Sequence, residues 1–379
     1  MSSAVVRTKL YEIDCHMRAT HTDNFVDSEF PPSRSSLGDL DAGRSQHRQS
    51  RVAAIDWARA QDLDGRRSRQ GLAWHVFNGD PRPGDVSQGM LGDCWLISAL
   101  AVLAERPQLL KDIMISDELD PHGAYGVRLC KDGLWQAVIV DDYFPCSSGS
   151  LAFSEARRGA LWVALIEKAY AKLHGSYAAI ESGRITEALT TLTGAACETE
   201  PLQPDFDDGP AIDTELLWAK LVSDKGKGYL TGVSSLSDDG SPEADGAEAR
   251  GIVTGHAYSL LQVYTLRSGE RLVKLRNPWG SKEWRGRWSD EDAERNPAVA
   301  HMLQTECDHT PAADDGVFCI EYADLLRNFT RLEVCKVREG WHEHRKLLPM
   351  PRPTAAGQEF RALSVKGTML SALYTHAGD

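Results

Sequence analysis

The sequence predicts an α+β protein with two subdomains, a mainly helical first half and a strand-rich second half. Two observations lead to this fold class. In the first half, apolar residues recur with helical spacing in segments 94–104 and 160–175. From about Cys197 onward, short runs of alternating apolar and polar residues, typical of strands, become the main pattern. The chain of 379 residues is long enough for about two or three domains.

The first half contains clear boundaries for its elements. The helical pattern of 94–104 ends before Pro107, and that of 160–175 stops at Gly175. Between them, the strand-like runs AYGVRLC and LWQAVIVDDYFP surround the turn residues 131–133, Lys-Asp-Gly. A turn of this composition between two such runs predicts a β-hairpin.

The second half begins with ELLWAKLVSDKG and the strand-like YLTGVSS. An insertion rich in Gly, Asp and Ala follows at residues 237–251. After it, HAYSLLQVYTL and RLVKLRNPWG read as two further strands. A β-rich unit is therefore expected here.

These patterns suggest four regions. Residues 1–24 are expected to be a flexible N-terminal arm, 25–195 the first subdomain, 196–342 the second, and 343–379 a linker or a truncated segment. The start of the chain lacks the apolar core of a signal peptide, and the longest apolar stretch, residues 94–104, is too short to span a bilayer.

Composition narrows the possible partners and compartment. The chain has 42 basic and 55 acidic residues, a net charge of −13, which argues against a nucleic-acid partner held by phosphate contacts. Its eight cysteines show no CxxC pair and no dense disulfide framework, so reduced thiols and a cytoplasmic location are expected. The sequence does not fix the oligomeric state.

The stretch QGMLGDCWLISAL, residues 88–100, places Cys94 after turn residues and at the start of a predicted helix. The positive end of a helix dipole stabilises a thiolate, so this position predicts a lowered thiol pKa. A small buried core residue is the alternative, because cysteine is commonly buried.

A nucleophilic cysteine needs a base, a group that orients the base, and donors for an oxyanion. His256 follows Gly255 at the start of a strand, and Asn277 stands at the end of the next strand. The Asn277 amide can accept from one imidazole nitrogen and leave the other for sulfur. Gln88, six residues before the thiol, can donate to the oxyanion beside the backbone N–H of Cys94.

Three ordered motifs carry a resemblance to a known family. The chain resembles the calpain protease core in three places: at Gln88 with GDCW, at GHAYS (255–259), and at RNPWG with EWRGRWSD (276–290). The resemblance covers residues 25–337, and LCKDGLWQAVIVDD and ALAVLAERP look most similar to the small-optic-lobes branch. The zinc fingers of that branch, and the calcium loops of a penta-EF-hand domain, are not found in this sequence.

This resemblance implies a papain-like fold and a calcium-modulated intracellular cysteine endopeptidase. Cys94 would lie on a helix of the first subdomain and His256 with Asn277 on the second, with the cleft between them. Gln88 would help form the oxyanion hole, and Trp279 would shield the bond between His256 and Asn277 from water. Its partners would be protein substrates, bound as extended peptide.

The resemblance also implies one Ca²⁺ ion in each subdomain. The first site would use the carboxylates of Asp85 and Glu167, completed by backbone oxygens near Asn78 and Asp80. The second site would use Glu283, Asp290 and Asp315. In that second site Val317 stands where the family has an acidic residue, so we expect weaker calcium binding there. The first subdomain departs from the family too, because Pro83 occupies its linking-arginine position, with Arg82 adjacent.

Two other functions fit parts of the pattern. A transglutaminase-type acyltransferase shares the Cys and His chemistry, but it orients the base with Asp, where this chain has Asn277. A catalytically silent interaction module would be free to lose any of the four active-site residues, and this chain keeps all four.

Overall fold

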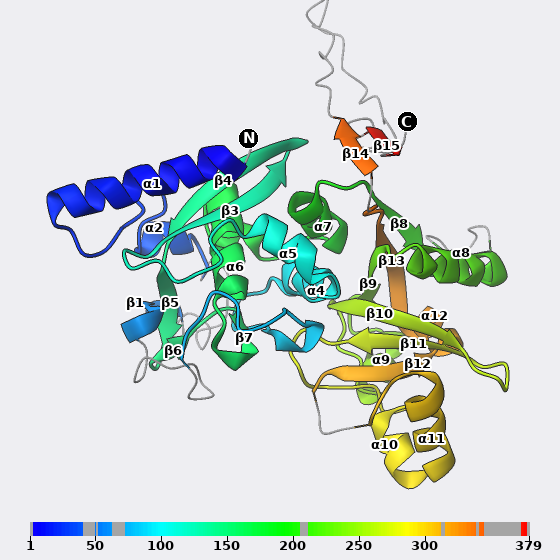
Figure 1. The fold of residues 1–379 in the computed structure, drawn as a ribbon. Coiled ribbons are helices and arrows are strands. Elements are labelled where there is room, and N and C mark those ends of the chain that lie inside the picture. Colours follow the sequence, from blue (N-terminus) through cyan, green and yellow to red (C-terminus); the bar gives the residue numbers. More distant parts are fainter. Residues whose placement is uncertain are drawn as a thin grey trace, which may run out of the picture.

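The structure, a computed structural model, describes residues 3–40, 50, 52–62, 73–204, 211–311, 315–338, 341–344 and 373–376. Its buried apolar side chains form two large clusters, one mainly from residues 30–195 and one from residues 202–334. A smaller third cluster lies between residues 266 and 319. Figure 1 shows the two halves beside each other, with helix α4 between them. The α+β fold class is confirmed, and it is that of a papain-like protease.

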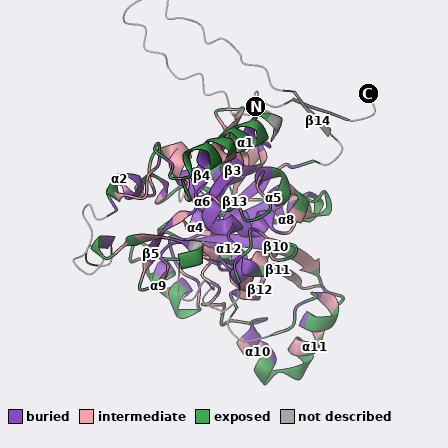
Figure 2. Ribbon diagram, turned by 60° about the vertical axis from the view of Figure 1, so that its left-hand side comes forward, coloured by how far each residue is buried: buried purple, intermediate pink, exposed green. Residues whose placement is uncertain are grey.

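The first half surrounds its core with helices and short antiparallel sheets. Its helices are α1 (Ser3–Thr20), α2 (Arg34–Leu37), α4 (Cys94–Leu103), α5 (Pro107–Ile113), α6 (Trp162–His174) and α7 (Ile185–Thr193). Its strands are β1 (Asp56–Arg59), β2 (Val86–Ser87), β3 (Ala124–Lys131), β4 (Leu134–Asp141), β5 (Tyr143–Ser147), β6 (Ser150–Leu151) and β7 (Glu155–Ala156). Nine of the ten residues of α4 are buried, and Figure 2 shows this helix inside the molecule.

The second half is built on one six-stranded antiparallel sheet. The strand order is β12-β11-β10-β9-β13-β8. Its strands are β8 (Cys197–Pro201), β9 (Leu230–Ser235), β10 (Ala257–Thr265), β11 (Arg271–Arg276), β12 (Val317–Glu321) and β13 (Phe329–Cys335). The helices of this half are α8 (Thr214–Gly226), α9 (Pro242–Ala249), α10 (Asp290–Arg295), α11 (Pro297–Glu306) and α12 (Tyr322–Asn328). The predicted domain boundary at 195/196 falls in the short link between α7 and β8.

The predicted elements around the nucleophile are confirmed. Helix α4 begins at Cys94, and α6 ends at His174, where Gly175 takes the left-handed conformation of a helix C-cap. Strands β3 and β4 pair with Lys131 opposite Leu134, so Asp132 and Gly133 alone make the turn. Both turn residues have positive φ, as a tight hairpin that follows the strand twist requires.

The expectation of a flexible arm over residues 1–24 is wrong for residues 3–20. These residues form α1, which lies across the β3–β4 hairpin (Figure 1). Val6 and Met17 of this helix are buried. A side-chain carbon at Gly126 of β3 would stand 2.7 Å from Val6 Cγ1, so the absence of a side chain there lets the helix approach the hairpin.

The acidic insertion at 237–251 also contains regular structure, namely α9. Ser241 caps this helix by accepting a hydrogen bond from the backbone N–H of Ala244. The expected C-terminal linker, 343–379, lies mostly outside the described residues. Within the described part, β14 (Trp341–His344) pairs with β15 (Leu373–His376). No described helix is long and apolar enough to cross a bilayer.

Candidate active site

Cys94 occupies the first position of α4, after a loop that is held tightly against the first half. In this loop, a side-chain carbon at Gly89 would stand 2.0 Å from the backbone oxygen of Phe153, so only glycine fits without displacing the chain. The backbone N–H groups of Leu96 and Ile97 both donate to the oxygen of Asp93, which closes the first turn. The thiol is therefore fixed at the N-terminal end of a buried helix.

The predicted lowering of the Cys94 pKa is wrong for this arrangement. Burial raises the pKa of the thiol to about 11, although backbone N–H groups of Ala257, Trp95 and Cys94 itself act in the opposite direction. The helix terminus does favour the thiolate, but the cost of placing a charge in the dry interior is larger here. In its resting state the nucleophile is a neutral thiol.

His256 and Asn277 are brought together as predicted. The imidazole Nε2 of His256 lies 3.0 Å from Oδ1 of Asn277, and both side chains are buried. The Asn277 amide is itself oriented, because its Nδ2 donates to the oxygen of Lys282 and its Oδ1 accepts from the backbone N–H of Trp279. With Nε2 paired to the amide oxygen, Nδ1 is the imidazole nitrogen left for the sulfur.

Trp279 covers this pair. The centroid of its ring lies 4.6 Å from that of His256, with the two rings tilted by 46°. Burial lowers the pKa of His256 to about 4, and the nearby charge of Lys282 acts in the same direction. The Asn277 hydrogen bond opposes this shift. The base is therefore neutral at pH 7 and able to accept a proton.

Gln88 lies in the loop before the nucleophile, but its side chain is engaged elsewhere. Its Nε2 donates to the oxygen of Leu91 at 2.7 Å and, at a longer 3.5 Å, to Oδ1 of Asp93. Its Oε1 is buried and has no hydrogen-bond partner in the described part of the chain. Both hydrogens of the Gln88 amide nitrogen therefore have acceptors, and the longer bond to Asp93 must give way before Gln88 can donate to an oxyanion.

The two halves meet at the catalytic residues through direct hydrogen bonds. Ser98 of α4 donates to the oxygen of Ala257, the residue after His256, and Ser259 donates back to the oxygen of Ser98. The backbone N–H of Gln88 donates to the oxygen of Pro278, which follows Asn277. These contacts hold α4 against β10. The sequence pattern did not single out the two serines, because isolated serines carry no distinctive spacing.

The residues expected to form the first calcium site are bound to protein groups instead. Arg158 contacts both carboxylate oxygens of Asp85, with Nε 2.8 Å from Oδ1. The same arginine donates to the backbone oxygen of Asp80, and its own backbone oxygen accepts from Asn78. A guanidinium therefore stands where a cation would bind. The sequence analysis did not identify Arg158, which follows another arginine in an ordinary polar segment.

Glu167 is bound by other protein groups. It is 2% exposed and points into the first half, where it accepts from the backbone N–H of Ser154 and contacts Asp93. Burial raises the pKa of its carboxyl to about 7. Glu167 is bound by protein groups here, and its role as a calcium ligand with Asp85 stays a prediction.

The three residues expected at the second site are also separately engaged. Glu283 accepts from the backbone N–H groups of Asp315 and Gly316, and Asp290 pairs with His309 at 2.7 Å. Oδ1 of Asp315 accepts from the backbone N–H of Val317. Across the described residues, no three His, Cys, Asp or Glu side chains converge to hold a metal ion. The residues present do not fit the predicted calcium shells.

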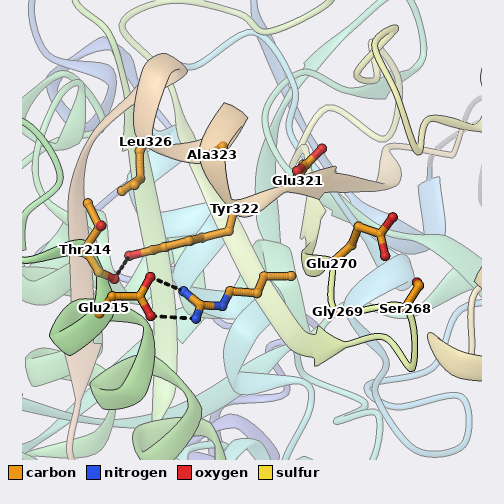
Figure 3. A pocket seen from close by; sticks show the side chains of 10 residues that line it. Thr214, Glu215, Ser268, Gly269, Glu270, Glu321, Tyr322, Ala323 and Leu326 are labelled. Atoms are coloured by element: carbon orange, nitrogen blue, oxygen red, sulfur yellow. Dashed lines mark hydrogen bonds and ion pairs between the residues drawn. The ribbon is translucent and has the colours of Figure 1, made fainter.

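A surface hollow of about 520 Å³ is lined by residues of α8, the turn between β10 and β11, and α12 (Figure 3). It opens beside the turn between β10 and β11, whereas His256 and Asn277 stand at the opposite end of these strands, roughly 30 Å away for a nine-residue strand. Arg271 and Glu215 form a bidentate ion pair in it, and the Tyr322 hydroxyl donates to the oxygen of Thr214. These groups already satisfy one another, so the hollow lacks the features of an active site.

Comparisons with known proteins agree with the geometry. A sequence profile described as calpain family cysteine protease matches residues 25–336. The chain is 40% identical over 325 residues to the calpain-type cysteine protease DEK1 of Arabidopsis thaliana, and 33% identical over 324 residues to the calpain-1 catalytic subunit of Rattus norvegicus. Each alignment covers 83% of this chain.

These relatives are much longer proteins. The chain spans 14% of the plant protein's length and 42% of the rat protein's length. Their names do not test the resemblance to the small-optic-lobes branch, which stays a prediction. What is shared is the segment that carries the thiol, the imidazole and the amide.

Proposed function

The chain belongs to the calpain family of cysteine proteases, and from this premise we propose that it is an endopeptidase that cleaves protein substrates. Cys94 is the nucleophile, His256 the general base, and Asn277 the group that orients the base. The observation that supports this most is the 3.0 Å contact between His256 Nε2 and Asn277 Oδ1. It is buried under Trp279 and next to the helix that begins at the thiol.

The reaction follows from the resting charges. Because both the thiol and the imidazole are neutral, His256 removes the thiol proton as sulfur attacks the scissile carbonyl carbon. The same proton then passes to the leaving amine, and a thioester to Cys94 remains. Water, deprotonated by His256, hydrolyses the thioester. The backbone N–H of Cys94 and one N–H of Gln88 would stabilise the oxyanion.

Cleavage of casein by the full chain tests this function. Wild-type protein should produce fragments that depend on Cys94 and on His256, so Cys94→Ser and His256→Ala should abolish them. Cys15→Ser is the matched control, because this thiol is exposed on α1 and far from the pair, and it should cleave normally. Undiminished cleavage by Cys94→Ser would refute the proposal, and amine incorporation without cleavage would favour the acyltransferase reading.

We propose further that calcium stimulates this core only at high concentration. Membership of a generally calcium-regulated family supports a response. The ion pair of Arg158 with Asp85 opposes it, because a cation must first displace the guanidinium. Arg158→Ala should therefore lower the calcium concentration that gives half-maximal cleavage. Arg327→Ala, which removes another arginine with a carboxylate partner, should leave it unchanged. An unaltered calcium response in Arg158→Ala would contradict this idea.

A cytoplasmic location completes the proposal. All eight cysteines are free thiols. Cys197 and Cys335 face each other across β8 and β13, where an oxidising compartment would favour a disulfide. Localising the tagged chain in cells tests this: a secreted product would contradict it.

A further inference from the structure

Arg276, the residue directly before Asn277, has a buried side chain that the reaction described above does not use. It is 0% exposed and lies at the end of β11. Its backbone is paired on both sides in the sheet, with Ser259 of β10 and with Val317 of β12. Its side chain, however, reaches the first half, because Nη2 donates to the backbone oxygen of Val86 in β2 at 2.6 Å. Arg276 therefore links the two halves of the protein.

The bond from Arg276 is one of two that join the same two segments, 86–88 and 276–278. The other runs from the backbone N–H of Gln88 to the oxygen of Pro278, at 3.1 Å. Together the two bonds form a clamp that attaches the chain to the first half on either side of the orienting amide. Only the bond from Arg276 uses a side chain, so it is the one that a substitution can remove.

Each side of the clamp is anchored in its own half. Strand β2 pairs with β7 of the first half, and the backbone N–H of Asn277 donates to the oxygen of Gly316 at 2.8 Å. Segment 86–88 leads into the loop that carries the thiol, and segment 276–278 carries the amide that orients the imidazole. The clamp therefore sets how the base is placed relative to the nucleophile.

The burial of Arg276 indicates that this side chain does not serve stability. Its Nε and Nη1 are buried and have no hydrogen-bond partner within the described residues. Buried donors without acceptors cost free energy of folding, and a guanidinium in a dry interior costs more than an apolar side chain of similar length. Proteins break the rules of burial in this way mainly at functional sites.

We propose that Arg276 is a positioning residue for hydrolysis: its bond to Val86 fixes Asn277 relative to the first half. The imidazole that Asn277 orients is thereby held in place to accept the proton of the thiol. This role presupposes the proposed endopeptidase function. A misplacement of about 1 Å can slow a reaction roughly a hundredfold, so a single bond at this position is sufficient to affect turnover.

Arg276→Met in the full chain tests the proposal, with casein as substrate. Methionine keeps an apolar stem and removes every donor. We expect kcat to fall about 10- to 100-fold with little change in KM, because the cleft still binds the substrate. The midpoint of urea unfolding should not fall, because the poorly paired guanidinium is gone. Arg271→Met is the matched control: this second arginine of β11 pairs with Glu215 in the surface hollow, and its loss should leave kcat unchanged.

Two further variants separate positioning from a general structural role. Arg276→Lys keeps one donor for the oxygen of Val86, so it should recover most of the lost turnover. Arg276→Met combined with Asn277→Ala should be no slower than Asn277→Ala alone, because the arginine acts through this amide. A merely structural role would instead add its own loss to that of Asn277→Ala.

Several results would overturn the proposal. They are an unchanged kcat in Arg276→Met, a lysine variant as slow as the methionine variant, and a double variant whose loss is the product of the two single losses. A fall in kcat that is accompanied by a lower unfolding midpoint would assign Arg276 to stability instead. Absence of cleavage by the wild-type chain would refute the endopeptidase function itself, and with it the premise of this role.

Discussion

Asn277 holds the His256 ring through its Oδ1, and the amide is itself fixed by two further hydrogen bonds: Oδ1 accepts from the backbone N–H of Trp279, and Nδ2 donates to the oxygen of Lys282. Removing this amide leaves the ring free to rotate and leaves Nε2 without its buried partner. A rotated ring presents the wrong nitrogen to sulfur in the transition state, while the substrate still binds the same cleft.

We therefore expect Asn277→Ala to lower kcat by roughly 10- to 100-fold with little change in KM. Steady-state kinetics on a peptide substrate measures both. Asn328→Ala is a matched control, because this asparagine is equally buried but contacts Arg250 and Asp324 instead. A change confined to KM would assign Asn277 to substrate binding.

The charge state of Cys94 leads to a prediction about labelling. Because burial raises the pKa of its thiol to about 11, only a small fraction is thiolate at pH 7. In the resting chain, brief iodoacetamide treatment at pH 7 should modify the exposed Cys15 faster than Cys94. The Cys94 rate should then rise about tenfold per pH unit up to pH 10, as the thiolate fraction does. Mass spectrometry of each thiol measures this, and a flat Cys94 rate would indicate a preformed ion pair.

At this scale the sequence could identify the catalytic residues but not their charges. The chemical needs of a thiol nucleophile point to His256 and Asn277 from residue type and strand position alone. The pKa of Cys94 depends on how much of α4 is covered by β10. The partner of the Asp85 carboxylate depends on where the Arg158 side chain lies. Both are consequences of packing between distant segments, which local pattern does not record.

Among the elements, the loop that leads into α4 keeps its position because the backbone of Gly89 packs directly against the backbone of Phe153. A side-chain carbon at Gly89 would stand 2.0 Å from the oxygen of Phe153, closer than any real contact. The loop carries Gln88, so any shift also moves the backbone bond from Gln88 to Pro278.

Gly89→Ala should therefore lower both stability and turnover, by about 2 kcal/mol or more in the free energy of unfolding. Gly84→Ala offers a matched control, because a side-chain carbon there meets nothing within 4 Å. Denaturant unfolding and casein cleavage of both variants measure the effects. Similar stability of the two would show that the loop can move aside.

Helices α1 and α9, which the sequence analysis did not predict, do carry recognisable sequence patterns. Val6, Leu10, Ile13 and Met17 recur at helical spacing in α1, and Ser241-Pro242 forms a typical start for α9. Charged and acidic neighbours obscured both patterns. The strand order of the second sheet is a different matter. Strand β13 lies between β9 and β8, a long-range pairing that no local signal specifies.

On the scale of the whole molecule, function depends on how the two halves meet along α4. Ser98 and Ser259 fix the middle of that contact, and the end of α4 contributes a further one. There Glu105 lies 3.3 Å from Lys225 of α8, and Arg106 donates to the oxygen of Gly228. Burial raises the pKa of Glu105 to about 7, more than Lys225 can offset.

This contact should make stability depend on pH. A carboxyl whose pKa is raised by folding favours the folded state below its ordinary pKa, and this contribution is lost as pH rises towards 7. Glu105→Gln stays neutral, so it should stabilise the chain at pH 8 but hardly at pH 5. Because 24% of the side chain is exposed, we expect a gain of about 1 to 2 kcal/mol rather than the full shift. Urea unfolding at both pH values measures it, with Glu291→Gln as control, because the Glu291 side chain is more exposed, at 42%. Equal effects of Glu105→Gln at pH 5 and pH 8 would show that Lys225 neutralises the carboxylate completely. The stability of the contact between the two halves would then not depend on pH through Glu105.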